Sequence, residues 1–568
     1  MGSKIHLFNK YYPWSEIRFN GFEFFLKGNV FLNDIFIYPE KLAELIYTLI
    51  RSEDGSQEKE LAEFLERLNG EFAIVVDAGD RIFCAVDKLR SIPLFYSLEE
   101  DDFLLSDTAC FLKDKCNSRL NEKNAAEFMV AGYVTGEETL FDGIKQVKNG
   151  EFLIYQKKDK LLKTSSYFRF LHGIYFDASE LQLLEMLDHV FVNAFSRLIE
   201  STVNQGKKLV IPLSGGLDSR IIIGMLKRLG VNDVTCISYG RKGNRESLIS
   251  KKVSEAVGYK WLFVEYTARK WYECYNSKEA DQFQIMAGNL SSLPHMQDFL
   301  ALQELKIQGK LSDNSVFVPG HSGDMLAGSH IPRNYLDNSR KYDLAVLLDD
   351  SLRKHYNLWK WPQGSELEHI FKEKIKKCAS GLEIADNNSC ANAIEFLDFN
   401  ERQAKFIINS VRVYEFFDYE WRIPLWDAEL INFFLKVPLK YRISQHLYKK
   451  YARDRLFSGE LSVLNEIDCT TDMLDLRPLD ERSKYEKLQY YRTFIHSYYD
   501  EKIDNPVWGR YFENPMISRL QIKVTRYENQ TIEEYPLLKN ILEYRNEKMY
   551  PLSINGLGAL IFLARNIT

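Results

Sequence analysis

The segment that most constrains the fold lies at residues 209–226 and reads LVIPLSGGLDSRIIIGML. Its first part, residues 210–213, is an apolar run typical of a parallel strand that is buried on both faces. The run stops at residues 214–216 and restarts with the spacing of an amphipathic helix. We therefore predict a buried strand, a tight glycine-containing turn and a helix.

The turn itself predicts phosphate binding. Its two glycines permit positive φ angles and close approach, and the amides that begin the next helix point toward one spot. Such a nest of amides binds pyrophosphate, and Asp218 can hold the accompanying Mg²⁺. An ordinary tight connection is the alternative, but two glycines, a carboxylate and two hydroxyls at fixed spacing are more specific than a single GxGxxG motif.

Length and composition bound the class of protein. The 568 residues suffice for two or three domains, and the net charge of -6 provides no basic surface, so we expect no nucleic-acid partner. The eight cysteines form no CxxC pair, which favours reduced thiols over a disulfide framework or a zinc site. The N-terminus lacks the order of a signal peptide, and the apolar residues 557–564 are too few to span a bilayer. We expect a cytoplasmic protein with no membrane partner.

Two domains are predicted, at residues 1–165 and 166–568. The first is a mixed α+β domain, and a polar, lysine-rich stretch at 156–166 predicts the linker. Its predicted strands lie at 22–26, 72–77, 81–86, 93–97, 103–106 and 150–155, and its helices at 39–51 and 58–68. In the second domain, strands at 210–213, 234–239 and 261–266 alternate with helices, including 180–205 and 246–257. This alternation predicts a doubly wound parallel sheet, followed from about residue 340 by mostly helical patterns.

Several motifs resemble the asparagine synthetase-like and β-lactam synthetase-like superfamily. SGGLDS at 214–219 is similar to the pyrophosphate loop of N-type ATP pyrophosphatases. LNGEFAIVVD at 68–77 and AVDKLRSIPLFY at 85–96 look like the glutaminase domain of class II amidotransferases, as do residues 132–134, 139–144 and 149–150. The resemblance extends to about residue 457. It implies an α+β N-terminal-nucleophile (Ntn) antiparallel sandwich, then an α/β PP-loop parallel-sheet domain of the adenine nucleotide α-hydrolase-like type with a helical C-terminal part.

The first domain lacks the nucleophile that this resemblance requires. Glutaminases of this class use a cysteine exposed by removal of the initiator methionine, and its own α-amine serves as the base. Position 2 is Gly2, and the first cysteine is Cys84, inside a predicted strand. The glutamine-binding segments are absent from residues 25–60, and Asn-Gly-Glu at 69–71 matches a later strand, so we interpret it as scaffold. We expect no glutaminase activity.

The resemblance implies a nucleotide and metal site at the strand ends. Asp218 and Asp324, the latter in VFVPGHSGDMLAG at 316–328, would share Mg²⁺, which prefers hard oxygen ligands. A structural turn aspartate is the alternative for Asp324, and a solvated residue at a helix start is the alternative for Glu246. The residues predicted to contact ATP are Leu213, Ser214, Gly215, Gly216, Asp218, Ser219, Ser238, Gly240, Glu246 and Gly320.

Two departures from asparagine synthetases concern the attacking nitrogen. His321 replaces their glutamate, and Met325 replaces the acid that follows the magnesium aspartate. An imidazole with a pKa of about 6.5 suits a base for a substrate amine, and ordering of the loop is the alternative role. Glu420, in YEWRIPLWDAEL at 419–430, would orient His321.

Two more predictions concern charged residues of the second domain. Arg422 is expected to pair with Asp427. Lys449, with Lys450 as second choice, matches a family lysine that neutralises charge at the α-phosphate, while a surface charge run is the alternative. The predicted catalytic residues are therefore His321, Glu420 and Lys449.

Together these features predict an AMP-forming ligase that uses ATP and Mg²⁺ to adenylate a carboxylate, then joins it to an amine or ammonia without hydrolysing glutamine. The alternatives are a β-lactam or lasso-peptide cyclase, amidation of a sugar acid in polysaccharide biosynthesis, and ammonia-dependent asparagine synthesis, which His321 and Met325 disfavour. A non-catalytic homologue is a further alternative. The substrate carboxylate belongs to a small molecule or a peptide, and a homodimer or a separate ammonia-supplying protein stays open.

Overall fold

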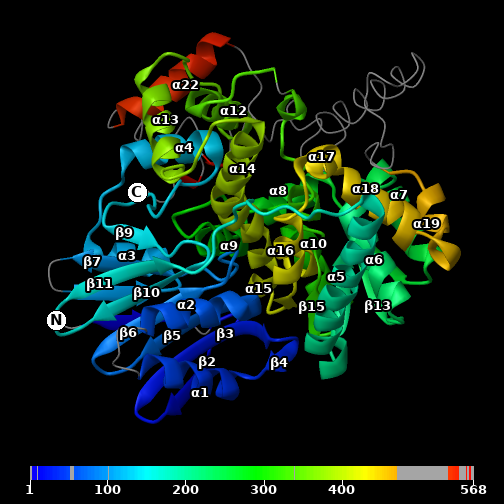
Figure 1. Ribbon diagram of the computed structural model, residues 1–568, viewed down its shortest axis with the longest axis horizontal. Helices are drawn as coiled ribbons and strands as arrows, with labels where there is room; N and C mark the ends of the chain where they lie inside the picture. The colour runs from blue at the N-terminus through cyan, green and yellow to red at the C-terminus, as the bar shows by residue number, and fades with distance from the viewer. Residues whose placement is uncertain are drawn as a thin grey trace.

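The computed structural model describes residues 3–8, 10–51, 57–99, 102–337, 339–469, 535–548, 558–559 and 562–563. Two mostly antiparallel sheets form the N-terminal part, shown in blue and cyan in Figure 1. The larger has the strand order β11-β10-β6-β5-β3-β2 with β4 beside β3, and the smaller has the order β1-β8-β7-β9. The strands are β1 (Lys4–His6), β2 (Ser15–Phe19), β3 (Phe22–Leu32), β4 (Ile35–Ile37), β5 (Leu68–Asp77), β6 (Arg81–Val86), β7 (Phe95–Glu99), β8 (Asp102–Ser106), β9 (Ile144–Gln146), β10 (Glu151–Gln156) and β11 (Leu161–Ser166).

Four helices accompany these sheets: α1 (Pro39–Ile50), α2 (Gln57–Arg67), α3 (Ala109–Cys116) and α4 (Glu122–Ala131). The predicted α+β class of this part is confirmed. The predicted linker at 156–166 is wrong, because β11 lies within it and pairs along its length with β10. Four of its six residues are exposed and none is buried, which explains the polar sequence, since β11 lies at the edge of the sheet.

The second part is built on a parallel sheet with the order β14-β13-β12-β15-β16. Its strands are β12 (Lys208–Pro212), β13 (Val234–Gly240), β14 (Lys260–Glu265), β15 (Ser315–Phe317) and β16 (Glu420–Trp421). From β12 the chain adds β13 and β14 on one side, then adds β15 and β16 on the other. The direction of winding therefore reverses between β12 and β15, and open α/β sheets bind ligands at such a switch point.

Helices surround this sheet and dominate the rest of the described chain (Figure 1), as predicted. Up to β15 they are α5 (Glu180–Ser201), α6 (Leu217–Arg228), α7 (Arg245–Ala256), α8 (Ala268–Tyr275), α9 (Lys278–Gly288) and α10 (Phe299–Ile307). Beyond β15 they include α11 (Gly323–Leu326), α12 (Leu344–His355), α13 (Glu366–Cys378), α14 (Asn387–Leu397), the π-helix η3 (Asp398–Ile407), η4 (Ile408–Val411), α15 (Arg412–Phe416), α16 (Ala428–Phe434), α17 (Leu439–Arg442), α18 (His446–Tyr451), α19 (Val463–Glu466) and α22 (Pro536–Lys548). Residues 470–534 lie outside the described part, as does much of the apolar segment at 557–564.

The Asn-Gly-Glu segment of β5 joins the two parts. Asn69 donates from Nδ2 to a carboxylate oxygen of Asp427 at 3.0 Å, and its Oδ1 accepts from the amide of Ala428 at 2.9 Å. Glu71 accepts from the amide of Ile423 at 3.0 Å. These contacts agree with the scaffold role predicted for the segment.

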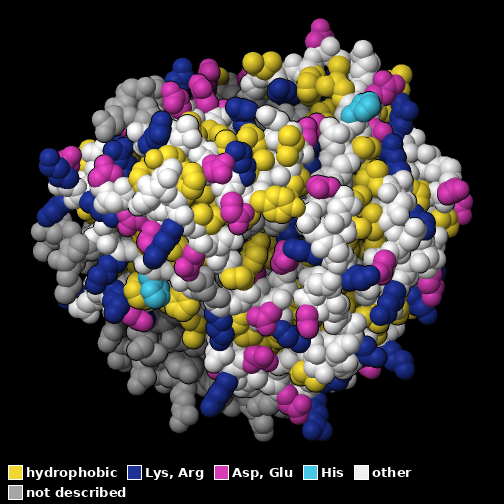
Figure 2. All heavy atoms as spheres, turned by 90° about the horizontal axis from the view of Figure 1, so that it is seen from below, with side chains coloured by type: hydrophobic (Ala, Val, Ile, Leu, Met, Phe, Trp, Pro, Cys, Tyr) yellow, Lys and Arg dark blue, Asp and Glu magenta, His cyan; other side chains and the backbone are white. Residues whose placement is uncertain are grey.

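None of the helices in the described ranges is long and apolar enough to cross a membrane. The face of the molecule seen in Figure 2 carries basic and acidic side chains intermingled, with no area of a single sign. That mixture agrees with the net charge of -6, which predicts no large basic surface. The expected cytoplasmic location stays a prediction.

Candidate active site at the switch point of the parallel sheet

The predicted phosphate loop connects β12 to α6 at the carboxyl edge of the sheet. Gly216 is the N-cap of α6, has φ -84° and ψ 176°, and provides no side-chain cap. These angles suit any residue, so Gly216 does not use the positive φ that a glycine permits. Instead, the missing side chain leaves the first amides of a 12-residue helix without a cap, as an anion site requires.

Side chains brace this loop from within. The hydroxyls of Ser214 and Ser219 lie 3.0 Å apart, and the amide of Gly216 donates to Ser214 Oγ at 3.1 Å. The carbonyl of Leu213 accepts from Ser238 Oγ at 2.9 Å, which ties the loop to β13. The side chains of Ser219 and Ser238 are thus structural, while their predicted contacts with ATP stay predictions.

Two further residues predicted to contact ATP lie toward the carboxyl edge of the sheet. Gly240 ends β13 with φ 128°, and its carbonyl accepts from the amide of Tyr266 at 2.7 Å. Glu246 is exposed in the first turn of α7. Gly240 is the last residue of β13, the strand next to β12, and Glu246 lies beyond it, so their contacts with ATP stay predictions.

A second loop, residues 318–323, packs directly against the start of α6. A Cβ atom on Gly320 would lie 2.8 Å from the amide nitrogen of Ser219. One on Gly323 would lie 2.5 Å from the hydroxyl oxygen of Tyr448. Only glycine fits at such distances, so these residues bring the loop of Asp324 against the phosphate loop.

Asp218 and Asp324 meet where the two loops touch. The amide of Asp324 donates to Asp218 Oδ2 at 3.2 Å, and Ser329 donates to Asp324 Oδ2 at 2.9 Å. Burial, reinforced by the negative charge of Asp324, raises the pKa of Asp218 to about 8. Both residues are half-buried, and Asp218 lies in the first turn of α6, beyond the end of β12.

This pair fits a magnesium ion. Two adjacent carboxylates repel each other unless a cation lies between them. Among the residues that the structure describes, no group of three or more His, Cys, Asp or Glu could hold a metal. Two protein carboxylates leave the other octahedral positions to water and phosphate oxygens, the arrangement that Mg²⁺ prefers.

Tyr448 is a site residue that sequence reasoning missed. Its hydroxyl donates to Asp218 Oδ1 at 2.8 Å, and the side chain is buried on α18. A signal for it is its place directly before Lys449, in the segment YKKYAR at residues 448–453. Of the two lysines that follow Tyr448, Lys450 forms an ion pair with Asp454 at 3.0 Å. Lys449 is half-buried, and its predicted role at the α-phosphate stays a prediction.

His321 lies in the loop that carries Asp324. Its Nε2 is 2.7 Å from Ser410 Oγ, which itself donates to the carbonyl of Ile407 at 2.6 Å. Because a hydroxyl has one proton, Nε2–H of His321 must donate to Ser410, and Nδ1 carries the lone pair. Burial, with the charge of His295, lowers the pKa of His321 to about 3, well below the expected value of about 6.5. The imidazole is therefore neutral at pH 7.

The predicted pairing of Glu420 with His321 is wrong. Glu420 accepts from Lys207 at 2.6 and 2.7 Å and from Arg422 at 3.0 Å. It lies beside Val316 in the sheet, at the amino ends of the strands, whereas the phosphate loop follows their carboxyl ends. Four residues of strand, about 13 Å, separate these two levels of the sheet.

The predicted pairing of Arg422 with Asp427 is wrong as well. Arg422 donates to Asn29 in the N-terminal part at 2.8 Å, and Asp427 pairs with Arg197 at 2.7 Å. Both residues therefore join elements that are far apart in the sequence.

Replacing Glu420 by glutamine is expected to lower the free energy of unfolding at pH 7 by about 2 kcal/mol, because Arg422 is buried and loses a charged partner. Burial opposes ionisation of Glu420, but Arg422 and Lys207 outweigh it and lower its pKa. This contribution is present above the ordinary pKa of a glutamate and is lost as the pH falls through the lowered pKa, so the difference from wild type should be smaller at pH 3 than at pH 7. Urea unfolding at both pH values measures it, with exposed Glu40→Gln as control. Unchanged stability with loss of amide formation would instead make Glu420 catalytic.

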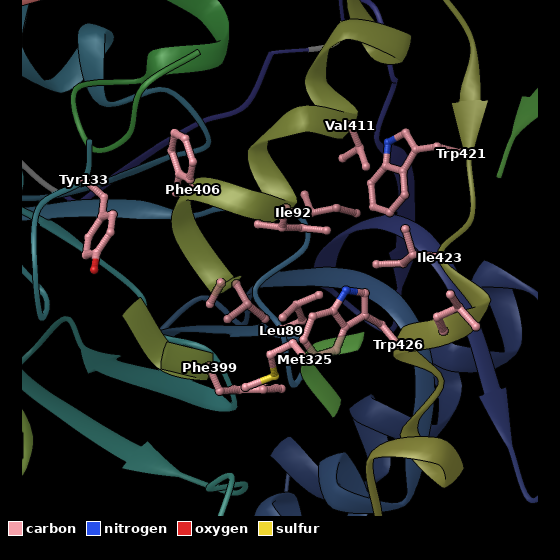
Figure 3. Close-up of a cluster of buried hydrophobic side chains, with 14 of the residues drawn as sticks. Leu89, Ile92, Tyr133, Met325, Phe399, Phe406, Val411, Trp421, Ile423 and Trp426 are labelled. Atoms are coloured by element: carbon pink, nitrogen blue, oxygen red, sulfur yellow. The ribbon is translucent and has the colours of Figure 1, made fainter. Parts of the chain in front are cut away.

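The surroundings of Met325 explain why this chain lacks the acidic residue that follows the magnesium aspartate in asparagine synthetases. Its side chain is fully buried. Figure 3 shows it among the apolar side chains of Phe399, Trp426 and Leu89, the last from the N-terminal part. A carboxylate at this position would be desolvated without a partner.

Comparisons with known proteins agree with this architecture. The family model described as "Asparagine synthase" matches residues 188–458, and that of a "Glutamine amidotransferase domain" matches residues 57–168. The chain belongs to the asparagine synthetase-like superfamily. The predicted fold class of this superfamily, an Ntn-type antiparallel part followed by a PP-loop parallel sheet, is confirmed, while the domain boundary near residue 165 stays a prediction.

A curated relative of this asparagine synthetase-like protein is the microcin J25-processing protein McjC of Escherichia coli, 22% identical over 312 residues. The match spans 54% of this chain and 54% of that protein, about half the length of each. Among solved structures, a glutamine phosphoribosylpyrophosphate amidotransferase from B. subtilis, complexed with ADP and GMP, is 13% identical with a TM-score of 0.20 and covers 44% of this chain and 72% of its own. An allosteric regulatory enzyme of purine biosynthesis is 14% identical, with a TM-score of 0.19 and coverages of 44% and 62%.

Proposed function

We propose that this asparagine synthetase-like protein is an ATP-dependent ligase that adenylates a substrate carboxylate, releases pyrophosphate and joins the acyl group to an amine. The observation that carries the proposal is the meeting of Asp218 and Asp324 beside the uncapped start of α6, at the switch point of the sheet. A carboxylate is a poor electrophile, and adenylation gives it a good leaving group. The free energy of splitting ATP thereby drives amide formation.

Each residue of the site has a role in this proposal. The first amides of α6 hold the pyrophosphate, while Asp218 and Asp324 hold magnesium, which neutralises phosphate charge. Tyr448 fixes the orientation of the Asp218 carboxylate through its 2.8 Å hydrogen bond. Nδ1 of His321 accepts a hydrogen bond, and finally a proton, from the attacking amine.

The nitrogen comes from a source other than glutamine hydrolysed on this chain. Cys84 is fully buried in β6, and burial holds its pKa far above the usual range, so it forms no thiolate. These observations support a first domain that acts as a scaffold.

A peptide is the favoured substrate within this proposal. The relative McjC is a microcin-processing protein, and ring closure within a peptide is one reaction that needs no ammonia source. The neutral imidazole of His321 also suits an amine that arrives uncharged, because it provides no negative charge to bind an ammonium group. An α-amine, with a pKa of about 8, supplies more neutral form at pH 7 than a lysine does.

The proposal is tested by incubating the protein with ATP, Mg²⁺ and a panel of acids, including aspartate, sugar acids and linear peptides with internal Asp or Glu. We expect pyrophosphate release with at least one acid, hydroxamate formation when hydroxylamine traps the adenylate, and, for a peptide, a product lighter by one water. Silence with every acid, together with failure to bind an ATP analogue, would contradict the proposal. Hydroxamate without amide would mean that the amine partner is still missing.

A further inference from the structure

One helix holds the Asp324 loop on both of its flanks. Two residues before Asp324, Ser322 donates from Oγ to Gln403 Oε1 at 2.7 Å. Six residues after it, Nδ1 of His330 lies 2.5 Å from Asp398 Oδ2. Gln403 and Asp398 both belong to the π-helix η3, and Gln403 Nε2 donates to the same Asp398 oxygen at 3.1 Å.

The π-helical geometry is what places these two side chains together. Residues five apart lie about 140° from one another around an α-helix, on different faces. A π-helix forms its hydrogen bonds between residues five apart, so Asp398 and Gln403 come to lie on one face. Such helices occur frequently at functional sites.

Ser322 is the position where this contact matters most. It has φ 61° and ψ 19°, in the left-handed region that is unfavourable for residues other than glycine. A Cβ atom on the next residue, Gly323, would lie 2.5 Å from the Tyr448 hydroxyl and 3.2 Å from Asp218 Oδ1, so this stretch of the loop lies against both side chains. The hydrogen bond to Gln403 offsets the backbone strain at Ser322 and keeps the loop against the start of α6.

Burial makes the chain of contacts specific. Gln403 and Asp398 are each 1% exposed, and Ser322 is 8% exposed. Gln403 must accept with Oε1 and donate with Nε2 at the same time, and an apolar side chain can do neither. Leaving the Ser322 hydroxyl without its acceptor would cost more than the bond itself contributes.

We propose that Gln403 is a positioning residue for the divalent cation, because it clamps Ser322 and so holds Asp324 against Asp218. This inference rests on the proposed function, which places the cation between the two aspartates. Gln403 does not touch the cation or the phosphates. It acts only through the conformation of the loop.

The test is Mn²⁺ binding followed by electron paramagnetic resonance, in the presence of a non-hydrolysable ATP analogue. Gln403→Leu and Ser322→Gly should each weaken Mn²⁺ binding about tenfold, and should raise the Mg²⁺ midpoint of pyrophosphate release by a similar factor. Ser322→Gly removes the hydroxyl but suits the positive φ, so it tests the bond without adding strain and folds even where Gln403→Leu does not. The double variant should be no weaker than Gln403→Leu alone, because both changes remove one contact.

The matched control is Glu401→Gln on the same π-helix. Glu401 accepts from the amide of Gly136 at 2.9 Å and from Lys405 at 2.5 Å, both away from the Asp324 loop. This control should lower the melting temperature and leave Mn²⁺ affinity unchanged. Three results would overturn the positioning role of Gln403. They are unchanged Mn²⁺ affinity in both Gln403→Leu and Ser322→Gly, an equal loss of affinity in Glu401→Gln, and a wild type that does not bind Mn²⁺. A wild type that binds Mn²⁺ but activates no acid would contradict only the proposed function.

Discussion

Replacing Asp218 by asparagine is expected to reduce pyrophosphate release by about a thousandfold or more while the protein stays folded. The variant keeps an oxygen for the hydrogen bond of Tyr448 but loses the negative charge that binds the cation. With one carboxylate left at Asp324, a weakly held magnesium ion no longer offsets the charge of the phosphates. Initial rates of pyrophosphate release at saturating ATP, over a range of Mg²⁺ concentrations, measure the loss.

The same substitution should stabilise the cation-free protein at high pH. The pKa of Asp218 is raised to about 8, so the folded state binds this proton more tightly than the unfolded state does. Ionised Asp218 therefore costs stability, and the cost grows as the pH rises from about 4 to about 8. The melting temperature of Asp218→Asn should therefore be higher than that of wild type at pH 8 and equal to it near pH 4.

Asp313→Asn is the matched control, because Asp313 is exposed before β15 at the opposite edge of the sheet. It should change neither the rate nor the melting temperature. Normal turnover in Asp218→Asn would refute the metal assignment. A lower melting temperature at pH 8 would mean that the charge of Asp218 is stabilised by contacts other than a bound cation.

Replacing His321 by alanine is expected to leave adenylate formation nearly intact while amide formation falls about a hundredfold. The imidazole lies in the loop of Asp324 but bonds to Ser410 instead of either aspartate, so its removal spares the metal. A hundredfold loss of amide formation is at the lower end of the range for removal of a proton acceptor, about 10² to 10⁴. We expect the lower end because burial lowers the pKa of His321 to about 3, which makes it a weak base. Hydroxamate formation reports the first step, and the amide product reports the second.

His321→Asn separates orientation of the amine from proton transfer. An asparagine provides an oxygen that accepts a hydrogen bond from a neutral amine, but it cannot take up a proton at neutral pH. Recovery of amide formation relative to alanine would assign an orienting role, and an equal loss would assign proton transfer. If alanine reduced both steps equally, His321 would only order the loop.

Short-range patterns predicted the individual elements well. The strand at 210–213 appears as β12 (Lys208–Pro212), and the strand at 81–86 appears as β6 with the same bounds. The helix at 39–51 appears as α1, one residue shorter. These elements follow from hydrophobic periodicity and from proline or glycine at their ends, which are visible in a short window of sequence.

Errors arose where burial depends on a distant partner. Residues 156–166 looked like a linker because most residues of the edge strand β11 are exposed, so its sequence is polar. Glu420 and His321 were predicted to pair because each lies in a segment that resembles a family motif, yet the register of β15 and β16 places Glu420 beside Val316. Sequence spacing does not reveal register between segments that are 100 residues apart.

The sequence by itself determined the glycine-containing turn after β12 and the carboxylate at Asp218, because each depends on residue identity within one short segment. Only the tertiary structure decided that Asp324 donates to Asp218, that Tyr448 holds this carboxylate and that His321 is a neutral imidazole bonded to Ser410. Those contacts join segments that meet only when the sheet and its helices pack. Packing also sets the burial that raises the pKa of Asp218 and lowers the pKa of His321, and no local sequence pattern encodes that burial.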